Sequence, residues 1–249
     1  HTAYRRQRQM CIRDRPRALK NAEVEQVIED FLSAIRRAIQ AGFDGVELHG
    51  ANTYLIQQFV SPHSNVRQDK WGGSLNNRLR FPKTLLKRAK QLVKEEADRP
   101  FLIGYRFSPE EIEEPGIQLY DTLKLLEQLI YHQVDYLHIS TSDVWRSSIR
   151  DSQDSEPVIQ KIIKKINGRV PLIGVGQIKT KQDAQRVLDA GIPLFALGKA
   201  LLLDPDWAEK VVSGREEEVI RAYRDELQAD LALPTAFVED ARSYLEGKD

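Results

Sequence analysis

The feature of this sequence that most constrains its fold is a regular alternation of short apolar runs with longer helical patterns. The apolar runs begin near residues 44, 101, 135, 171 and 194. Between them, apolar residues recur at helical spacing, as in Val24, Ile28 and Ile35. Continuously apolar strands that alternate with helices predict a parallel sheet covered on both faces. We therefore expect an α/β fold.

The number of strands leaves two architectures open. A chain of 249 residues has the length typical of a (β/α)8 barrel. The five predicted strands suit a doubly wound open sheet, whereas a closed barrel needs eight. Because no low-complexity linker interrupts the pattern, we predict a single domain over residues 21–249, with a charged helical tail from Trp207 onward.

Positive charge is concentrated at the start of the chain. Residues 1–20 contain seven basic side chains and one acid, whereas residues 21–249 carry a net charge of −6. A mildly acidic body disfavours a phosphate-backbone binder, so we expect no nucleic-acid partner. The chain starts at His1, and we predict that residues 1–20 are a non-native or disordered leader. An Arg-rich transit peptide and a nucleic-acid arm are the alternatives.

Two counts exclude further classes of protein. Cys11 is the single cysteine, which excludes a disulfide framework, a cysteine-ligated zinc site and an iron–sulfur cluster held by this chain alone. No run approaches the roughly 18 apolar residues of a membrane span, so we expect no membrane partner and a cytoplasmic location.

Polar residues follow the first predicted strand, where the active sites of α/β proteins lie. His49, Asn52 and Tyr54 occur within six residues just past the strand end. Such side chains can orient a carbonyl oxygen and deliver a proton. The alternative, of equal weight, is a helix start capped by Asn52, with a hydrogen-bonded histidine and a packed tyrosine.

Arg106 lies among apolar neighbours near the end of the second predicted strand. A guanidinium in that position requires an anionic or electron-rich partner, because buried arginine is rarely unpaired. From this residue alone, an internal salt bridge with Glu47 is slightly favoured over a ligand.

Two successive glycine turns predict a phosphate site. Gly176 and Gln177 follow one strand, and Gly198 and Lys199 follow the next. In barrel enzymes the backbone N–H groups of such loops commonly bind phosphate. Tight turns without a ligand are the less favoured alternative. Thr180, three residues before Asp183, predicts the start of the adjoining helix.

The sequence resembles the old yellow enzyme family of FMN-dependent oxidoreductases. The resemblance covers about residues 22–210 and depends on runs at positions 42–55, 61–81, 174–176 and 196–207, which include GFDGVELHGAN and WGGS. It implies a (β/α)8 barrel with FMN at its C-terminal mouth. NADH or NADPH would reduce the flavin, which would then reduce an activated C=C bond.

The resemblance also implies roles for individual residues. His49 and Asn52 would hydrogen-bond the oxygen of an α,β-unsaturated carbonyl, a small enone-type molecule, and Tyr54 would protonate the α-carbon. Arg106 would lie against the pyrimidine end of the flavin. The FMN phosphate would be held by Val175, Gly176, Gln177, Gly198 and Lys199.

Three residues depart from the usual family pattern. Lys199 replaces an arginine, Gln177 a frequent glycine and Thr53 a common glycine, and none of these changes removes a functional group. We expect the five strands to be the fourth to eighth of the barrel, with the first three outside this chain.

Other interpretations remain at this stage. They are a non-flavin barrel lyase or isomerase acting on a phosphorylated substrate, and a non-catalytic fragment. The preferred nicotinamide, the physiological acceptor and the oligomeric state, monomer or homo-oligomer, stay open.

Overall fold

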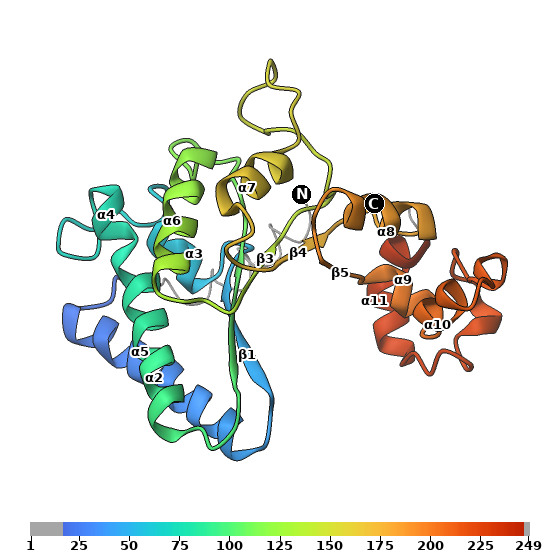
Figure 1. The fold of residues 1–249 in the computed structure, drawn as a ribbon, viewed down its shortest axis with the longest axis horizontal. Coiled ribbons are helices and arrows are strands. Elements are labelled where there is room, and N and C mark those ends of the chain that lie inside the picture. Colours follow the sequence, from blue (N-terminus) through green and yellow to red (C-terminus); the bar gives the residue numbers. More distant parts are fainter. Residues whose placement is uncertain (1–16, 247–249) are drawn as a thin grey trace.

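The computed structural model describes residues 17–246, and the cysteine and most of the predicted basic leader lie outside these residues. Figure 1 shows strands and helices alternating along the chain, followed by a group of helices at the C-terminal end. The strands are β1 (Gly45–Gly50), β2 (Leu102–Phe107), β3 (Tyr136–Ile139), β4 (Leu172–Val175) and β5 (Leu194–Ala196). All five predicted strands are therefore confirmed.

The helices of the alternating part agree with the predicted apolar spacing. They are α2 (Asn21–Gln40), α5 (Arg80–Glu96), α6 (Leu119–Tyr131), α7 (Val158–Ile166) and α8 (Lys181–Asp189). The predicted start of α8 is confirmed, because the Thr180 side chain accepts from the Asp183 N–H and the Asp183 carboxylate accepts in return. Short helices that the spacing does not predict are α3 (Leu55–Val60), α4 (Leu75–Arg78) and α9 (Lys199–Leu203).

The strand order decides between the two predicted architectures. The strands form one parallel sheet in the order β1-β2-β3-β4-β5, so each strand pairs with the next one along the chain. A doubly wound sheet reverses its order at a switch point, whereas a barrel does not. The described strands therefore have the topology of consecutive units of a barrel.

The two faces of the sheet differ, contrary to the prediction that both are covered. One face carries buried apolar side chains, among them Leu48, Ile103 and Leu137, which belong to the main core with the helices. The other face carries polar side chains on β1 to β3, and Leu102 and Leu194 on it are each 49% exposed. Alternation along the strands separates the two sets, and the polar face is the one available to a site.

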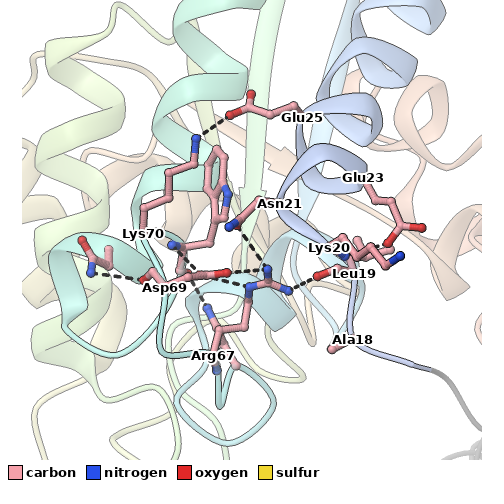
Figure 2. Close-up of polar contacts among 12 residues, drawn as sticks. Ala18, Leu19, Lys20, Asn21, Glu23, Glu25, Arg67, Asp69 and Lys70 are labelled. Carbon is pink, nitrogen blue, oxygen red and sulfur yellow. Dashed lines mark hydrogen bonds and ion pairs between the residues drawn. The ribbon is translucent and has the colours of Figure 1, made fainter.

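The loop between α3 and α4 is fastened to the start of α2. Figure 2 shows the Arg67 guanidinium between the carboxylate of Asp69 and the carbonyl of Leu19. Lys70 pairs with Glu25 of α2 at 2.8 Å. Residues 17–20, the described end of the predicted leader, thus contact the body of the protein.

The C-terminal part is helical, as predicted, but broken into short pieces. These are α9, α10 (Trp207–Val212), two 3₁₀ turns at Glu216–Glu218 and Asp225–Leu227, and α11 (Thr235–Glu246). Leu203, Tyr223, Val238 and Leu245 form a small apolar cluster separate from the main core. Among the described helices, none combines the length and the apolarity needed to cross a membrane.

Candidate active site

The turn after β1 presents His49, Asn52 and Tyr54 at the carboxyl edge of the sheet. Asn52 and Thr53 have positive φ angles of 56° and 62°, and the Tyr54 N–H closes the turn on the Ala51 carbonyl. Two consecutive residues in the left-handed backbone conformation reverse the chain tightly, so the three polar residues lie before the first residue of α3 and are not part of that helix.

This turn contradicts the helix-cap alternative. The residue that caps α3 is Tyr54, and it makes no side-chain cap hydrogen bond. The Asn52 side chain is directed elsewhere, and the Tyr54 ring is 47% exposed instead of packed in the core. The three residues are therefore not explained by helix capping.

Asn52 is fixed by residues that follow the next two strands. Its backbone N–H donates to the Ser108 hydroxyl at 2.9 Å, and its side-chain oxygen accepts from the Ser140 hydroxyl at 2.9 Å. Arg106 donates in turn to the Ser140 oxygen at 3.0 Å. Because the carboxamide oxygen is already bonded, the NH₂ group remains as the hydrogen-bonding end of Asn52.

His49, near the end of β1, provides a second donor. Its ring centroid lies 5.0 Å from that of Tyr54. Burial, together with the positive charge of Arg106, lowers the pKa of His49, so the imidazole is neutral at pH 7. A neutral imidazole offers one N–H donor, and the buried Nδ1 has no hydrogen-bond partner among the described residues.

Arg106 does not form the predicted ion pair with Glu47. The Glu47 carboxylate contacts His138 Nδ1 at 3.0 Å, and Arg106 donates instead to the Ser140 hydroxyl. The buried Nε of Arg106 lacks a partner within the described part of the chain. The internal salt-bridge alternative is therefore wrong, and a buried donor is left for a ligand.

The predicted phosphate residues lie at the ends of two adjacent strands. Val175 pairs with Ala196, which brings Gly176 and Gln177 beside the turn at Gly198. Gly176 has a φ of +111°, and a Cβ there would lie 2.7 Å from the backbone nitrogen of Asp143, so this turn requires glycine.

Lys199 has a neighbour that the sequence pattern does not predict. Its ammonium lies 5.3 Å from the centroid of the Tyr244 ring, which belongs to α11. The C-terminal helix therefore adjoins the predicted phosphate turns.

Two buried glutamates that the sequence pattern does not predict join the loops around the site. Glu111, after β2, accepts hydrogen bonds from Gln57 of α3 and from Ser61, which directly follows that helix. Glu110 accepts from Ser148 and Arg146 in the loop after β3. The sequence signal that could have identified them is the pair of consecutive acids soon after a strand, because a buried carboxylate requires hydrogen-bond donors as partners.

The residues present fit a flavin of the kind implied by the resemblance. Unpartnered buried nitrogens at His49 and Arg106 are hydrogen-bonding groups that lack a protein partner among the described residues. The glycine turns after β4 and β5 supply backbone N–H groups and a cation for a phosphate.

Comparison with known proteins gives relatives of the expected kind. The chain is 50% identical over 207 residues to NADH:fumarate oxidoreductase of Klebsiella pneumoniae (strain 342), which covers 82% of this chain and 22% of the relative. It is 46% identical over 203 residues to the probable NADH-dependent flavin oxidoreductase YqiG of Bacillus subtilis (strain 168). This match covers 82% of this chain and 55% of the relative. The chain thus spans between about a fifth and about half of these curated relatives.

Solved structures give the same result. The old yellow enzyme homologue from Zymomonas mobilis matches with a TM-score of 0.64 and 25% identity, over 80% of this chain and 54% of that one. Morphinone reductase in complex with tetrahydroNAD matches with a TM-score of 0.64 and 27% identity, over 80% and 52%. With the sequential strand order, these matches identify the sheet as part of a (β/α)8 barrel.

The family profile described as NADH:flavin oxidoreductase / NADH oxidase matches residues 1–218. The resemblance seen in the sequence is therefore confirmed, and the cofactor of this family is FMN. The chain belongs to the NADH:flavin oxidoreductase / NADH oxidase family.

Proposed function

We propose that this site uses FMN and NADH or NADPH to reduce the activated C=C bond of an α,β-unsaturated carbonyl compound. The observation that carries the proposal is the hydrogen-bonded chain from Arg106 through Ser140 to Asn52, which leaves the Asn52 amide as a donor in the turn that follows neutral His49. Two neutral donors, one at the end of β1 and one in the turn after it, suit a carbonyl oxygen on which negative charge develops.

Each residue has a distinct part in the proposed reaction. FMN, when bound, supplies the hydride chemistry between the nicotinamide and the β-carbon. His49 and Asn52 donate hydrogen bonds to the carbonyl oxygen and so polarise the alkene. Tyr54, half-exposed beside His49, donates the proton that the α-carbon requires.

The remaining site residues bind and orient the cofactor. Arg106 stabilises the negative charge that the pyrimidine end of the flavin gains on reduction. The phosphate is held by the strand-end residues Val175, Gly176, Gln177, Gly198 and Lys199.

The names of relatives agree with this substrate class at a coarse level. Two of them, NADH:fumarate oxidoreductase and NADH:acrylate oxidoreductase, are named for compounds with a C=C bond next to a carboxyl carbon. This chain covers 22% of each, so their substrates do not define the acceptor of this site. We propose the enone class on the hydrogen-bond donors described above.

The proton-donor role of Tyr54 can be tested kinetically. In the FMN-loaded protein, Tyr54→Phe should slow reoxidation of the reduced flavin by cyclohexenone by about 100-fold or more, the usual contribution of a general acid. Reoxidation by oxygen should be nearly unchanged, because it needs no proton at the α-carbon. Tyr120→Phe removes the hydroxyl of an exposed tyrosine on α6 and serves as the matched control. An unchanged rate with cyclohexenone in Tyr54→Phe would show that the assignment is wrong.

A further inference from the structure

A carboxylate–histidine pair lies on the polar face of the sheet, and its histidine is the register partner of Arg106. His138 Nδ1 of β3 lies 3.0 Å and 3.2 Å from the two carboxylate oxygens of Glu47 of β1. These strands are not neighbours, because β2 lies between them. The pair therefore spans two strand spacings, about 9.6 Å.

Glycine at position 104 makes this contact possible. Gly104 of β2 is in register with Glu47 on one side and Tyr136 on the other. A Cβ at Gly104 would lie 2.0 Å from Cζ of Tyr136, so the tyrosine ring occupies the space that a side chain would need. With no side chain on β2 at this level, the Glu47 carboxylate reaches across to β3.

The chemistry of the pair determines which nitrogen of His138 can change its proton. Contacts with His138 and the charge of Arg106 outweigh burial and lower the pKa of Glu47, so this carboxylate is ionised and can only accept. His138 Nδ1 must therefore carry a hydrogen in either charge state of the ring. Only Nε2 is left to gain or lose a proton.

The location of Nε2 relates it to the cofactor site. His138 is 9% exposed, and its Nε2 is buried with no hydrogen-bond partner among the described residues. His138 is the register partner of Arg106, which is in turn the partner of His49, so the three side chains form a row on one face. A proton on Nε2 would place a positive charge beside Arg106.

We propose that His138 balances charge in this site, taking up a solvent proton at Nε2 when the flavin is reduced and releasing it on reoxidation. The inference rests on the proposed function, in which Arg106 faces the flavin. The two electrons of reduction enter and leave the flavin as hydride, so His138 transfers no electrons and only forms and breaks an N–H bond. His138 acts through Arg106 and is a positioning residue.

The charges around His138 explain why reduction would favour the proton. From β1, Glu47 favours the imidazolium, and the neighbouring His49 is neutral. From β2, the positive charge of Arg106 disfavours the imidazolium. Tyr136 of β3 lies next to Glu47, and Ile173 of β4 is uncharged. Reduction adds negative charge to the flavin opposite Arg106, and this charge offsets the repulsion between Arg106 and a protonated His138. By linkage, the proton on His138 in turn favours the reduced flavin.

The test is the midpoint potential of the bound flavin, measured from about pH 5 to about pH 8, where histidines titrate. Wild-type protein should take up more protons per two electrons than His138→Gln in part of this range, so its potential should fall more steeply with pH. His132→Gln changes a histidine at the end of α6 and should match wild type. Glu47→Gln should move the steep region to lower pH, because the group that favours the imidazolium is gone.

Each outcome has one meaning. If His138→Gln binds flavin and follows the wild-type potential at every pH, the inference is wrong while the proposed function stands. If His138→Gln does not retain flavin, Glu47→Gln carries the test, and an unshifted curve overturns the inference. If wild-type protein takes up no FMN from solution, the proposed function fails, and this inference fails with it.

Discussion

Thr53 and Gln177 carry side chains in a backbone conformation that ordinarily favours glycine. Their φ angles are 62° and 54°, and both lie in turns that build the proposed site. A β-branched residue such as threonine is a marked exception in the left-handed region. Such strain persists at sites where the surrounding structure fixes the turn, and here the hydrogen bonds of Asn52 to Ser108 and Ser140 do so.

Relief of this strain is the first prediction at the residue scale. Thr53→Gly should raise the free energy of unfolding by about 1 kcal/mol, because strain at such a position is on the order of 1–3 kcal/mol and glycine adds some entropy to the unfolded chain. The turn itself should survive, since Thr53 uses its backbone N–H and C=O toward Gln57 and Gln58. Urea unfolding measures the change. A loss of stability would show that the side chain contributes more than the strain costs.

A matched control lies at the end of α7. Asn167 also has a positive φ, of 49°, but asparagine tolerates the left-handed conformation much better than threonine. Asn167→Gly should therefore change the stability less than Thr53→Gly.

At the scale of elements, the buried carboxylate of Glu111 fastens the loop after β2 to α3. Glu111 accepts from Gln57 at 2.6 Å, Ser61 at 2.5 Å and the Ile117 N–H at 3.0 Å. Glu111→Ala should lower the free energy of unfolding by about 2 kcal/mol, because it leaves these donors buried without a partner. Glu114→Ala removes an exposed partner of Arg150 from the same loop and should cost at most about 1 kcal/mol. Equal effects of the two changes would contradict this account.

The C-terminal helices depend on a second buried carboxylate, Asp204. Burial by itself would raise the pKa of Asp204, but Lys210 at 2.8 Å and the Ile220 N–H at 2.9 Å outweigh it and lower that pKa. The stabilisation is therefore present above the ordinary aspartate pKa of about 3.9 and is lost as the pH falls through the lower folded value.

Asp204→Asn tests this dependence on pH. At pH 7 the variant should be less stable than wild type by about 2 kcal/mol, the usual contribution of charged hydrogen bonds. Unfolding measured at successively lower pH should show the difference shrinking below about pH 4. A difference that stays constant down to the acid transition would mean that the charge of Asp204 is not what stabilises this part.

The sequence predicted the periodic elements better than the contacts between them. Apolar spacing identifies all five strands because continuous burial on one face leaves a readable pattern. The short helix α3 has no such period, since its six residues make less than two turns. The Glu47–His138 pair was missed because it depends on strand register and on Gly104, which no local pattern reports.

At the scale of the whole molecule, consecutive strands in sequential order place every strand end on one edge. His49 at the end of β1 is in register with Arg106 of β2, and Arg106 is linked through Ser140, after β3, to Asn52 in the turn after β1. The family match implies FMN, and we propose that the flavin lies at this edge of the sheet. Of the predicted site residues, Asn52 and Arg106 are joined by hydrogen bonds through Ser140, and the catalytic roles as well as the phosphate-binding roles stay predictions.

The most direct test of the account is the binding of FMN to this 249-residue chain, followed by quenching of flavin fluorescence. Wild-type protein should bind FMN saturably, and Arg106→Met should weaken binding by about tenfold to a hundredfold, as expected for a lost hydrogen bond to a charged group. Arg88→Met, on the exposed side of α5, should bind like wild type. Absence of quenching with wild type, or equal affinity in Arg106→Met, would contradict the assignment of this edge as the flavin site.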